Sequence, residues 1–438
     1  MPAMLKRSVG YAYPWDYAGD LAAASRAATL GLDAVAVAAS YHATRAATPL
    51  HPDRRIFEAE HAACYVPVRE QAWRGHRLVP ALPAWDPDGD SFGNACRQLT
   101  AEGLQTEAWI VLTHNSALGR GHPDLVVRNA FGDVYPYALC PAAQDVQEYC
   151  LTLVEEIVRS GRVHGVVLET CGPMGIEHGG KHDKTEFAEW DEARLGLLSL
   201  CFCQACEGRY TAAGVDRGDL AQLVRVGVDA GSGTIEDCLG DELAAEVAAV
   251  RTGIAKELRA MLVARCRSVD PDVRITMHGS DDPWATGSFA TLQPAVGEGI
   301  DGVVATCWDP AAGGRRISGL RALVGPGIDV GAYLRLDRGW PASELTDRRL
   351  QEYLTSGMSE LHLYHLGLLG QQGLAAMRHV IDTTSRTLSG LLLTDGVWVD
   401  APSGPPGGSC GRHRTRRAGR HSRTLGGVRR RYVRVPAA

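Results

Sequence analysis

Lysine is scarce in this chain of 438 residues. Only four of its 45 basic side chains are lysines, and the other 41 are arginines. No apolar run approaches the roughly 20 residues that span a bilayer, and the segment after Lys6 and Arg7 lacks the apolar core of a signal peptide. These absences predict a cytoplasmic protein with no membrane partner, whose cysteines are free thiols or metal ligands.

A basic surface is also missing from most of the chain. Residues 1–400 carry 35 basic and 51 acidic side chains, which disfavours nucleic-acid binding because phosphate contacts need clustered basic groups. The residues after 400 contain ten arginines and no acid. Because this end has no hydrophobic periodicity, residues 393–438 are predicted to be an Arg-rich, disordered tail. The oligomeric state does not follow from the sequence.

Eight short apolar runs alternate with segments of helical length. They cover residues 9–13, 34–39, 107–113, 164–169, 272–278, 302–308, 328–335 and 360–365. Continuous apolar runs are typical of parallel strands buried on both faces. Eight such strands alternating with helices indicate the α/β class and a single (β/α)8 TIM barrel over residues 1–392. A doubly wound open sheet is the alternative, but no glycine-rich phosphate-binding loop follows an early strand.

Three connections between the predicted strands are long. Long loops follow strands two, three and four, and an additional strand is expected at residues 78–82. Residues 170–271 contain a helical insertion between strands four and five. Long connections after barrel strands lie over the C-terminal face, where active sites form.

The carboxyl ends of the strands are rich in aromatic and polar side chains. Rings stack on the C–H faces of sugars, and polar side chains bind hydroxyls, so this set predicts a site for a small carbohydrate. A polar barrel rim with aromatic core residues is the structural alternative. The predicted substrate-binding residues at strand ends are Tyr11, Tyr13, Trp15, His42, His114, Asn115, His278, Trp308, Tyr333, Arg335 and His365.

Glu169 is the first candidate for a catalytic residue. It ends the apolar run 164–169, and a carboxylate at the end of a buried strand is costly unless it is paired or used in chemistry. Desolvation is expected to raise its pKa, which suits a general acid. The alternative is a structural ion pair with an arginine.

The loop after Glu169 is a second candidate region. It contains His178, Lys181 and His182, and with Lys184 it has two of the four lysines in the chain. The two glycines between the histidines favour a loop over a helical metal pair. We therefore predict substrate contacts by His178, Lys181 and His182, with a solvated polar loop as the alternative.

Three cysteines form a C-x-C-x-x-C motif further along this connection. Cys201, Cys203 and Cys206 can surround a tetrahedral zinc with one more ligand. Cys171 is the predicted fourth ligand, and Cys140 is the alternative. Such a zinc is structural and fixes the long fourth loop. Buried thiols without a metal are the other interpretation.

The glutamate at the end of strand four and the cysteine motif after it resemble family 42 β-galactosidases and related hypothetical glycoside-hydrolase barrels. This resemblance implies that Glu169 is the acid/base and that the three cysteines bind zinc with one further cysteine. The sequence is also similar to a group of uncharacterised, alanine-rich actinobacterial proteins from residue 8 to about residue 380. The segments that carry this similarity are 11–15, 114–116, 129–141 and 198–206.

The chain departs from the glycosidase pattern at two positions. Leu168 stands before Glu169 where the pattern has asparagine, and strand seven has no glutamate nucleophile. The second catalytic carboxylate is therefore open. Its separation from Glu169 would be about 5 Å in a retaining enzyme and about 6.5–9.5 Å in an inverting one. The candidates are Asp309, which is the first choice, and Asp337, Asp281 and Asp282.

The sequence therefore predicts a glycoside-hydrolase-like enzyme that acts on a small sugar or glycoside. The first alternative is a metal-dependent sugar isomerase, epimerase or lyase, in which Glu169, His278 and Asp309, with His178, hold a divalent cation. The second alternative is a barrel that binds sugar without catalysis.

Overall fold

The computed structural model describes residues 5–86, 89–177, 184–231, 233–294, 299–336 and 343–394. Residues Met1–Leu393 form one compact unit. Of the Arg-rich tail predicted at residues 393–438, the first two residues belong to the last helix, and residues 395–438 lie outside the described residues. Within the described ranges, no helix is both long enough and apolar enough to cross a membrane.

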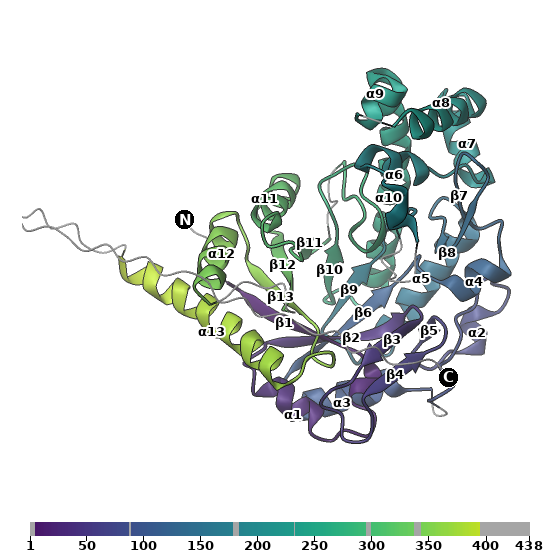
Figure 1. Cartoon of the computed structure of the whole chain (residues 1–438). Helices are drawn as coiled ribbons and strands as arrows, with labels where there is room; N and C mark the ends of the chain where they lie inside the picture. The colour runs from purple at the N-terminus through teal and green to yellow at the C-terminus, as the bar shows by residue number, and fades with distance from the viewer. Residues whose placement is uncertain are drawn as a thin grey trace, which may run out of the picture. The chain divides into compact units, whose positions relative to one another are not determined.

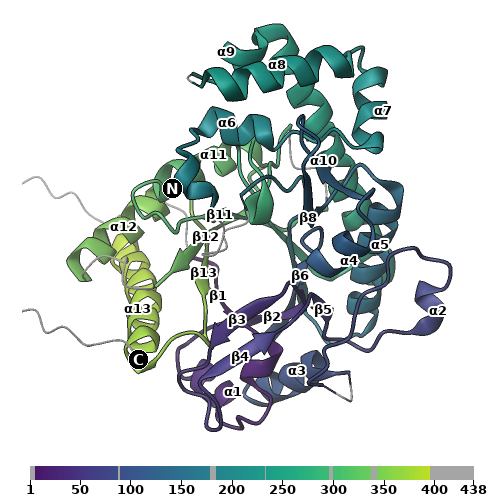
Figure 2. The same cartoon turned by 45° about the vertical axis from the view of Figure 1, so that its right-hand side comes forward.

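Eight parallel strands close into a barrel (Figures 1 and 2). β1 pairs with both β2 and β13, so the sheet closes on itself and the predicted α/β-class (β/α)8 barrel is confirmed. Each of the eight predicted barrel strands overlaps an observed one. The strands are β1 (Arg7–Ala12), β2 (Ala34–Tyr41), β6 (Gln105–Val111), β9 (Gly165–Glu169), β10 (Arg274–His278), β11 (Gly302–Thr306), β12 (Asp329–Arg335) and β13 (Glu360–Tyr364).

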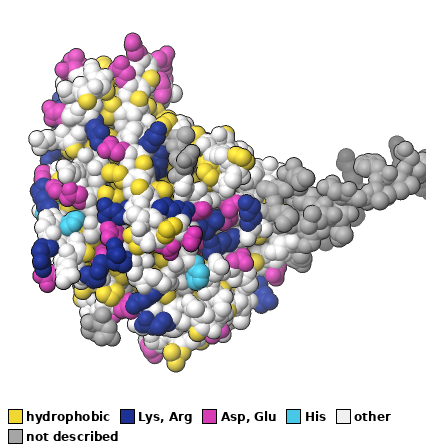
Figure 3. Space-filling view, turned by 180° about the vertical axis from the view of Figure 1, so that it is seen from behind, with side chains coloured by type: hydrophobic (Ala, Val, Ile, Leu, Met, Phe, Trp, Pro, Cys, Tyr) yellow, Lys and Arg dark blue, Asp and Glu magenta, His cyan; other side chains and the backbone are white. Residues whose placement is uncertain are grey.

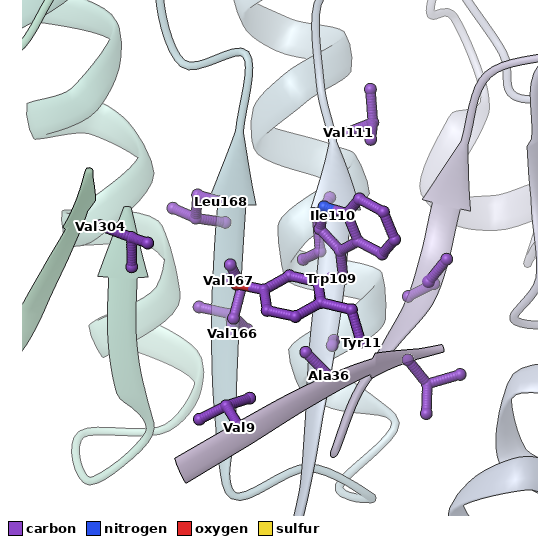
Figure 4. Close-up of a cluster of buried hydrophobic side chains, with 14 of the residues drawn as sticks. Val9, Tyr11, Ala36, Trp109, Ile110, Val111, Val166, Val167, Leu168 and Val304 are labelled. Atoms are coloured by element: carbon purple, nitrogen blue, oxygen red, sulfur yellow. The ribbon is translucent and has the colours of Figure 1, made fainter. Parts of the chain in front are cut away.

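The barrel strands are apolar along their whole length because both of their faces are covered. β2 has the sequence AVAVAASY, and all eight positions are buried. Larger side chains fill the interior. Figure 4 shows Tyr11 of β1 beside Trp109 of β6, with their ring centroids 5.2 Å apart in an edge-to-face arrangement.

Helices surround the barrel on its outer side. Among the described residues, the connection from β10 to β11 contains only a 3-10 turn, η3 (Gly287–Phe289), in place of the usual helix. The longest helix, α10, has 29 residues and packs against α5. The outer helices are α1 (Ala23–Ala28), α3 (Ser91–Ala101), α5 (Gln144–Arg159), α10 (Asp241–Val269), α11 (Gly313–Leu323), α12 (Ser343–Thr355) and α13 (Gln371–Thr394).

Long connections follow β2 and β6, as predicted. The connection after β2 forms a hairpin, β3 (Thr44–Ala47) with β4 (Ile56–Ala59), and then β5 (Ala63–Cys64) and α2 (Glu70–Trp73). The prediction of a strand at residues 78–82 is wrong, because the structure has no strand there. β5 occupies the edge of β2 by antiparallel pairing, and Ala81 only accepts one hydrogen bond from Cys64 N, at 2.9 Å.

The connection after β6 forms α4 (Ser116–Gly121) and the hairpin β7 (Val126–Arg128) with β8 (Val134–Leu139). The connection after β9 is the predicted helical insertion, and Figure 2 shows its helices together on one side of the barrel. They are α6 (Glu192–Leu198), α7 (Gln204–Ala212), α8 (Arg217–Ala230) and α9 (Ile235–Leu239).

Side-chain caps begin three of the inserted helices. Asp191, Asp216 and Thr234 each accept a hydrogen bond from the backbone three residues ahead, which satisfies an N–H group that the helix leaves unpaired. The insertion and the β7–β8 hairpin share a hydrophobic core of their own, separate from the barrel core. The insertion is therefore a packed structure rather than a loose loop.

Candidate active site

The fourth barrel strand ends at a buried carboxylate. Glu169 is the last residue of β9, opposite Val111 of β6, and is only 4% exposed. Thr170 follows with φ at 58°, a region that β-branched residues rarely adopt. Its hydroxyl accepts hydrogen bonds from Leu112 N at 2.9 Å and Thr113 N at 3.0 Å. These bonds hold the strained turn and fix where Glu169 leaves the strand.

Glu169 has two buried polar neighbours. Trp109 Nε1 donates to Glu169 Oε2 at 2.8 Å, and His278 Nδ1 lies 3.2 Å from the same oxygen. Burial raises the pKa of Glu169. The contact with His278 and the weaker effect of the hydrogen bond from Trp109 together lower it by more than burial raises it, so the net pKa lies below its usual value. The prediction of a raised pKa is therefore wrong, because the polar contacts outweigh desolvation and favour the ionised carboxylate. Burial lowers the pKa of His278, which favours a neutral imidazole.

A chain of polar side chains continues from His278 through the barrel interior. The Tyr11 hydroxyl lies 2.9 Å from His278 Nε2 and 3.0 Å from His362 Nδ1. His362 Nε2 lies 3.4 Å from Glu360 Oε2, and Arg274 donates to Glu360 Oε1 at 2.6 Å. These contacts hold the imidazole of His278 in one orientation.

A cavity of about 480 Å³ lies in front of Glu169, within the usual size range of ligand pockets. Most of its walls are aromatic, and a few polar groups converge on it, which suits a sugar ring with its hydroxyls. The lining residues are Tyr41, His42, Thr44, Trp109, His114, Glu169, Met174, Glu177, Thr286, Gly287, Ser288, Phe289, Trp308, Tyr333 and Tyr364.

Some of the predicted site residues line this cavity together. His42 and His114 stack with their ring centroids 4.2 Å apart. Trp308 is 40% exposed, and the Arg335 guanidinium lies over its ring, 4.8 Å from the centroid. The predicted residues that line the cavity are Glu169, His42, His114, Trp308 and Tyr333.

Other predicted contact residues are buried behind the cavity wall. Tyr13 stacks on Trp15 with the centroids 4.3 Å apart, and its hydroxyl lies 3.1 Å from the hydroxyls of Tyr41 and Tyr364. Residues of this second row position the wall rather than face the cavity. They are Tyr11, Tyr13, Trp15, His278 and His365, none of which is more than 2% exposed.

Within the described ranges, the remaining predicted site residues do not line the cavity or form its second row. Asn115 accepts a hydrogen bond from Leu118 N at 3.0 Å and caps α4. Asp309 accepts one from Ala311 N at 2.9 Å in the turn before α11. Neither Asn115 nor Asp309 is among the residues that line the cavity. His178, Lys181, His182 and Asp337 lie outside the described residues.

Several cavity residues were absent from the sequence prediction. Tyr41 and Tyr364 end strands, so their position was a usable signal, and Trp109 lies within a predicted strand. Phe289 and Glu177 lie in connections where no pattern marks them. Of the described carboxylates, Glu177 alone lines the cavity with Glu169, and it is exposed.

Four buried cysteines meet between the insertion and the β7–β8 hairpin. Cys140 Sγ lies 3.8 Å from Cys201 Sγ and 3.5 Å from the Sγ atoms of Cys203 and Cys206. All four sulfurs lie within 4.8 Å of one another. A tetrahedral metal with bonds of about 2.3 Å to four thiolates places the sulfurs about 3.8 Å apart, so the cluster fits a metal ion.

Cys171, the predicted fourth ligand, does not belong to this cluster. It lies two residues after the end of β9, and its side chain packs in the barrel core. Cys140 follows β8, and Phe202 N donates to Arg128 O at 2.6 Å, which draws the hairpin and the cysteine loop together. The structure therefore corrects the fourth cysteine from Cys171 to Cys140.

Comparisons with known proteins support the fold. The sequence matches no protein-family model and no curated protein. The structure is similar to the PgaB (BpsB) glycoside hydrolase domain from Bordetella bronchiseptica, with a TM-score of 0.54 and 14% identity over 85% of this chain and 98% of that one. It is also similar to the β-amylase catalytic domain from Paenibacillus polymyxa, with a TM-score of 0.53 and 12% identity over 87% and 100%.

A third similar structure is the β-galactosidase from the psychrophilic Marinomonas ef1, with a TM-score of 0.52 and 10% identity over 88% of this chain and 60% of that one. At these identities the likeness concerns the fold alone. The relation to family 42 β-galactosidases and to the actinobacterial group stays a prediction. The chain has the parallel eight-stranded barrel that these glycoside hydrolases have.

Proposed function

We propose that this chain hydrolyses glycosidic bonds of a carbohydrate bound in front of Glu169. The observation that carries this proposal is an ionised, buried carboxylate beside an aromatic-walled cavity at the C-terminal end of the barrel strands. Trp308 and Tyr333 provide ring faces for stacking, and their centroids lie 6.0 Å apart. The barrel shared with glycoside hydrolases adds support to a carbohydrate substrate.

The proposed chemistry divides the work between two carboxylates. Glycoside cleavage passes through a transition state with positive charge on the sugar ring. The Glu169 carboxylate, held by Trp109 and His278, stabilises this charge without having to reorganise. As the glycosidic bond breaks, Glu177 donates its proton to the leaving oxygen. Water then adds to the sugar carbon and gives one proton back to Glu177, which restores the acid. Glu177 thus replaces Asp309 as the second carboxylate.

The Glu169→Gln variant tests this proposal. The amide keeps the size of the side chain but removes its negative charge, so we expect the turnover of aryl glycosides to fall by about 10³-fold. A panel of chromogenic α- and β-glycosides measures the activity, and circular dichroism and thermal unfolding check the fold.

Glu102→Gln is the matched control, because Glu102 is exposed at the end of α3 and is expected to leave turnover unchanged. Wild-type turnover in the Glu169→Gln variant would contradict the assignment. If the wild-type chain binds sugars but cleaves no glycoside in the panel, the non-catalytic alternative is supported instead.

The metal-dependent alternative receives no support from the described residues. Glu169 and His278 are in contact, but Asp309 does not join them, and His178 lies outside the described ranges. The four cysteines are the one group of three or more potential ligands that gathers within the described parts of the chain.

We infer that the four-cysteine cluster holds a structural zinc ion. Four thiolates with no open position are typical of structural rather than catalytic zinc. Cys140, Cys201, Cys203 and Cys206 would hold the ion, and it would link two long connections of the barrel. The catalytic steps above do not involve it.

A further inference from the structure

A second cleft adjoins the cavity at Glu169. It has a volume of about 710 Å³. The cleft and the cavity share Glu177, Thr286, Ser288 and Phe289 as lining residues. The cleft and the cavity therefore adjoin along these four residues, so neighbouring units of one ligand can lie on either side of them.

The two sides of the cleft come from different parts of the chain. Leu195 and Ser199 belong to α6 and its C-terminal end, while Asp282 and Trp284 belong to the connection after β10. Arg316, near the start of α11, completes the barrel side. Carboxylates, hydroxyls and guanidinium groups beside an indole ring offer hydrogen bonds and a stacking face, which a saccharide requires.

A buried arginine connects both sides of the cleft. Arg251 of α10 is 6% exposed. Its Nη1 donates to Ser199 O at 3.4 Å on the insertion side, and its Nη2 donates to Trp284 O at 3.2 Å and Ala285 O at 3.4 Å on the barrel side. One guanidinium therefore fixes the spacing between the two sides.

The shared rim is also fixed relative to Glu169. Phe289 stacks on His278 with the ring planes 3° apart and the centroids 4.7 Å apart, and His278 contacts the carboxylate. At Gly175, a Cβ atom would lie 2.3 Å from Ser199 Oγ and 2.8 Å from Thr286 Oγ1. This close packing joins the connection after β9 to both sides of the cleft.

From this geometry we propose that the cleft binds the next unit or units of a linear saccharide whose first unit lies in front of Glu169. The proposal rests on the proposed carbohydrate site and goes beyond it, because it assigns a chain of at least two sugar units as the ligand. A single sugar would leave the cleft empty and would forgo its contacts. Affinity therefore increases with the number of units.

The Leu195→Trp variant tests the proposal. Leu195 is half-buried on the cleft side of α6, and an indole ring there fills part of the cleft. The probes are α-1,4-glucan, β-1,4-glucan and β-1,4-galactan series of one to four units, with binding measured by calorimetry. For the wild type, we expect Kd in one series to fall by about tenfold or more between one and three units. In Leu195→Trp this gain is lost.

Leu223→Trp is the matched control, because Leu223 is 37% exposed on α8 and does not line the cleft. If Leu195→Trp does not fold, Trp284→Ala replaces it, since loss of the indole removes the stacking face and should reduce the same gain in affinity. Folding of each variant is checked by thermal unfolding.

The outcomes separate this proposal from the proposed function. Equal Kd values for one and three units in every series would overturn the cleft proposal, even where glycosides are cleaved. A gain that Leu195→Trp leaves intact would overturn it as well. If no glycoside is cleaved, but longer chains bind more tightly and only the cleft variants lose this gain, the cleft proposal holds and hydrolysis fails.

Discussion

The ionised state of Glu169 depends on side chains from the strands on either side of it. β9 lies between β6 and β10 in the barrel, and these two strands provide Trp109 and His278. The Trp109 N–H donates to the carboxylate and so stabilises its charged form. Loss of this donor must therefore raise the pKa of Glu169.

The Trp109→Phe variant tests this dependence. If catalysis needs ionised Glu169, activity disappears as the pH falls through the pKa of this group. A hydrogen bond to a charged group contributes about 1.5–3 kcal/mol, so the acid limb of kcat/KM should move up by about one to two pH units. The pH profile measures this position even if the plateau also falls.

Trp73→Phe provides the control for this experiment, because the buried Trp73 N–H has no hydrogen-bond partner. Its acid limb should stay at the wild-type position. An acid limb that does not move in Trp109→Phe would contradict the role of the indole. A shift confined to the basic limb would show that the protonated form of Glu169 is the active one.

The strands were predictable because burial on both faces requires continuous apolar sequence, as in β2. Their ends therefore identified Glu169, His114 and Trp308. The division between cavity wall and second row was not predictable, since it depends on how barrel closure turns each side chain. Tyr13, for example, packs behind Tyr41. Glu177 lies in a connection whose path follows from tertiary packing alone.

A short element after β1 has a predictable effect on stability. η1 (Pro14–Asp16) ends at Asp16, which is 9% exposed. Burial raises its pKa to about 7, although the hydrogen bond from Tyr13 N and the charges of Arg54 and Arg26 oppose the increase. The folded state therefore binds a proton more tightly than the unfolded state, whose reference pKa is 3.8. Stability must decrease as the pH rises from about 4 to about 7.

The Asp16→Asn variant removes this penalty and keeps an acceptor for Tyr13 N. We expect it to be more stable than the wild type at pH 8, by up to about 4 kcal/mol, and to lose this advantage at pH 4. Urea unfolding at pH 4, 6 and 8 measures the difference. Asp20→Asn should instead lower the stability at pH 8, because Asp20 forms an ion pair with Arg26 and the pKa of Asp20 is lowered. A pH-independent effect of Asp16→Asn would contradict the assignment.

On the scale of the whole folded unit, two long connections depend on each other. Cys140 follows the hairpin after β6, and the other three cysteines follow β9, so a metal ion bound by all four would join segments that the barrel alone does not pair. The order of the insertion rests on its own hydrophobic core and on the four-cysteine cluster. On the face shown in Figure 3, acidic and basic side chains are interspersed, so this face has no patch with charges of one sign.

The Cys140→Ser and Cys171→Ser variants test this arrangement as a matched pair. Both cysteines are buried, but only Cys140 belongs to the cluster. Elemental analysis of the wild type should give one zinc per chain, and Cys140→Ser should lower this content, because three thiolates bind zinc less tightly than four. Cys171→Ser should retain the metal.

Loss of the metal should also loosen the insertion before the barrel. Structural zinc contributes directly to folding free energy, so Cys140→Ser, or the wild type after chelation, should be cleaved by protease within residues 184–240. The barrel, which has a separate core, should keep its far-ultraviolet circular dichroism. A full zinc content in Cys140→Ser with a loss in Cys171→Ser would reverse the assignment of the fourth ligand. A protease-resistant insertion without zinc would show that its apolar core alone maintains the structure.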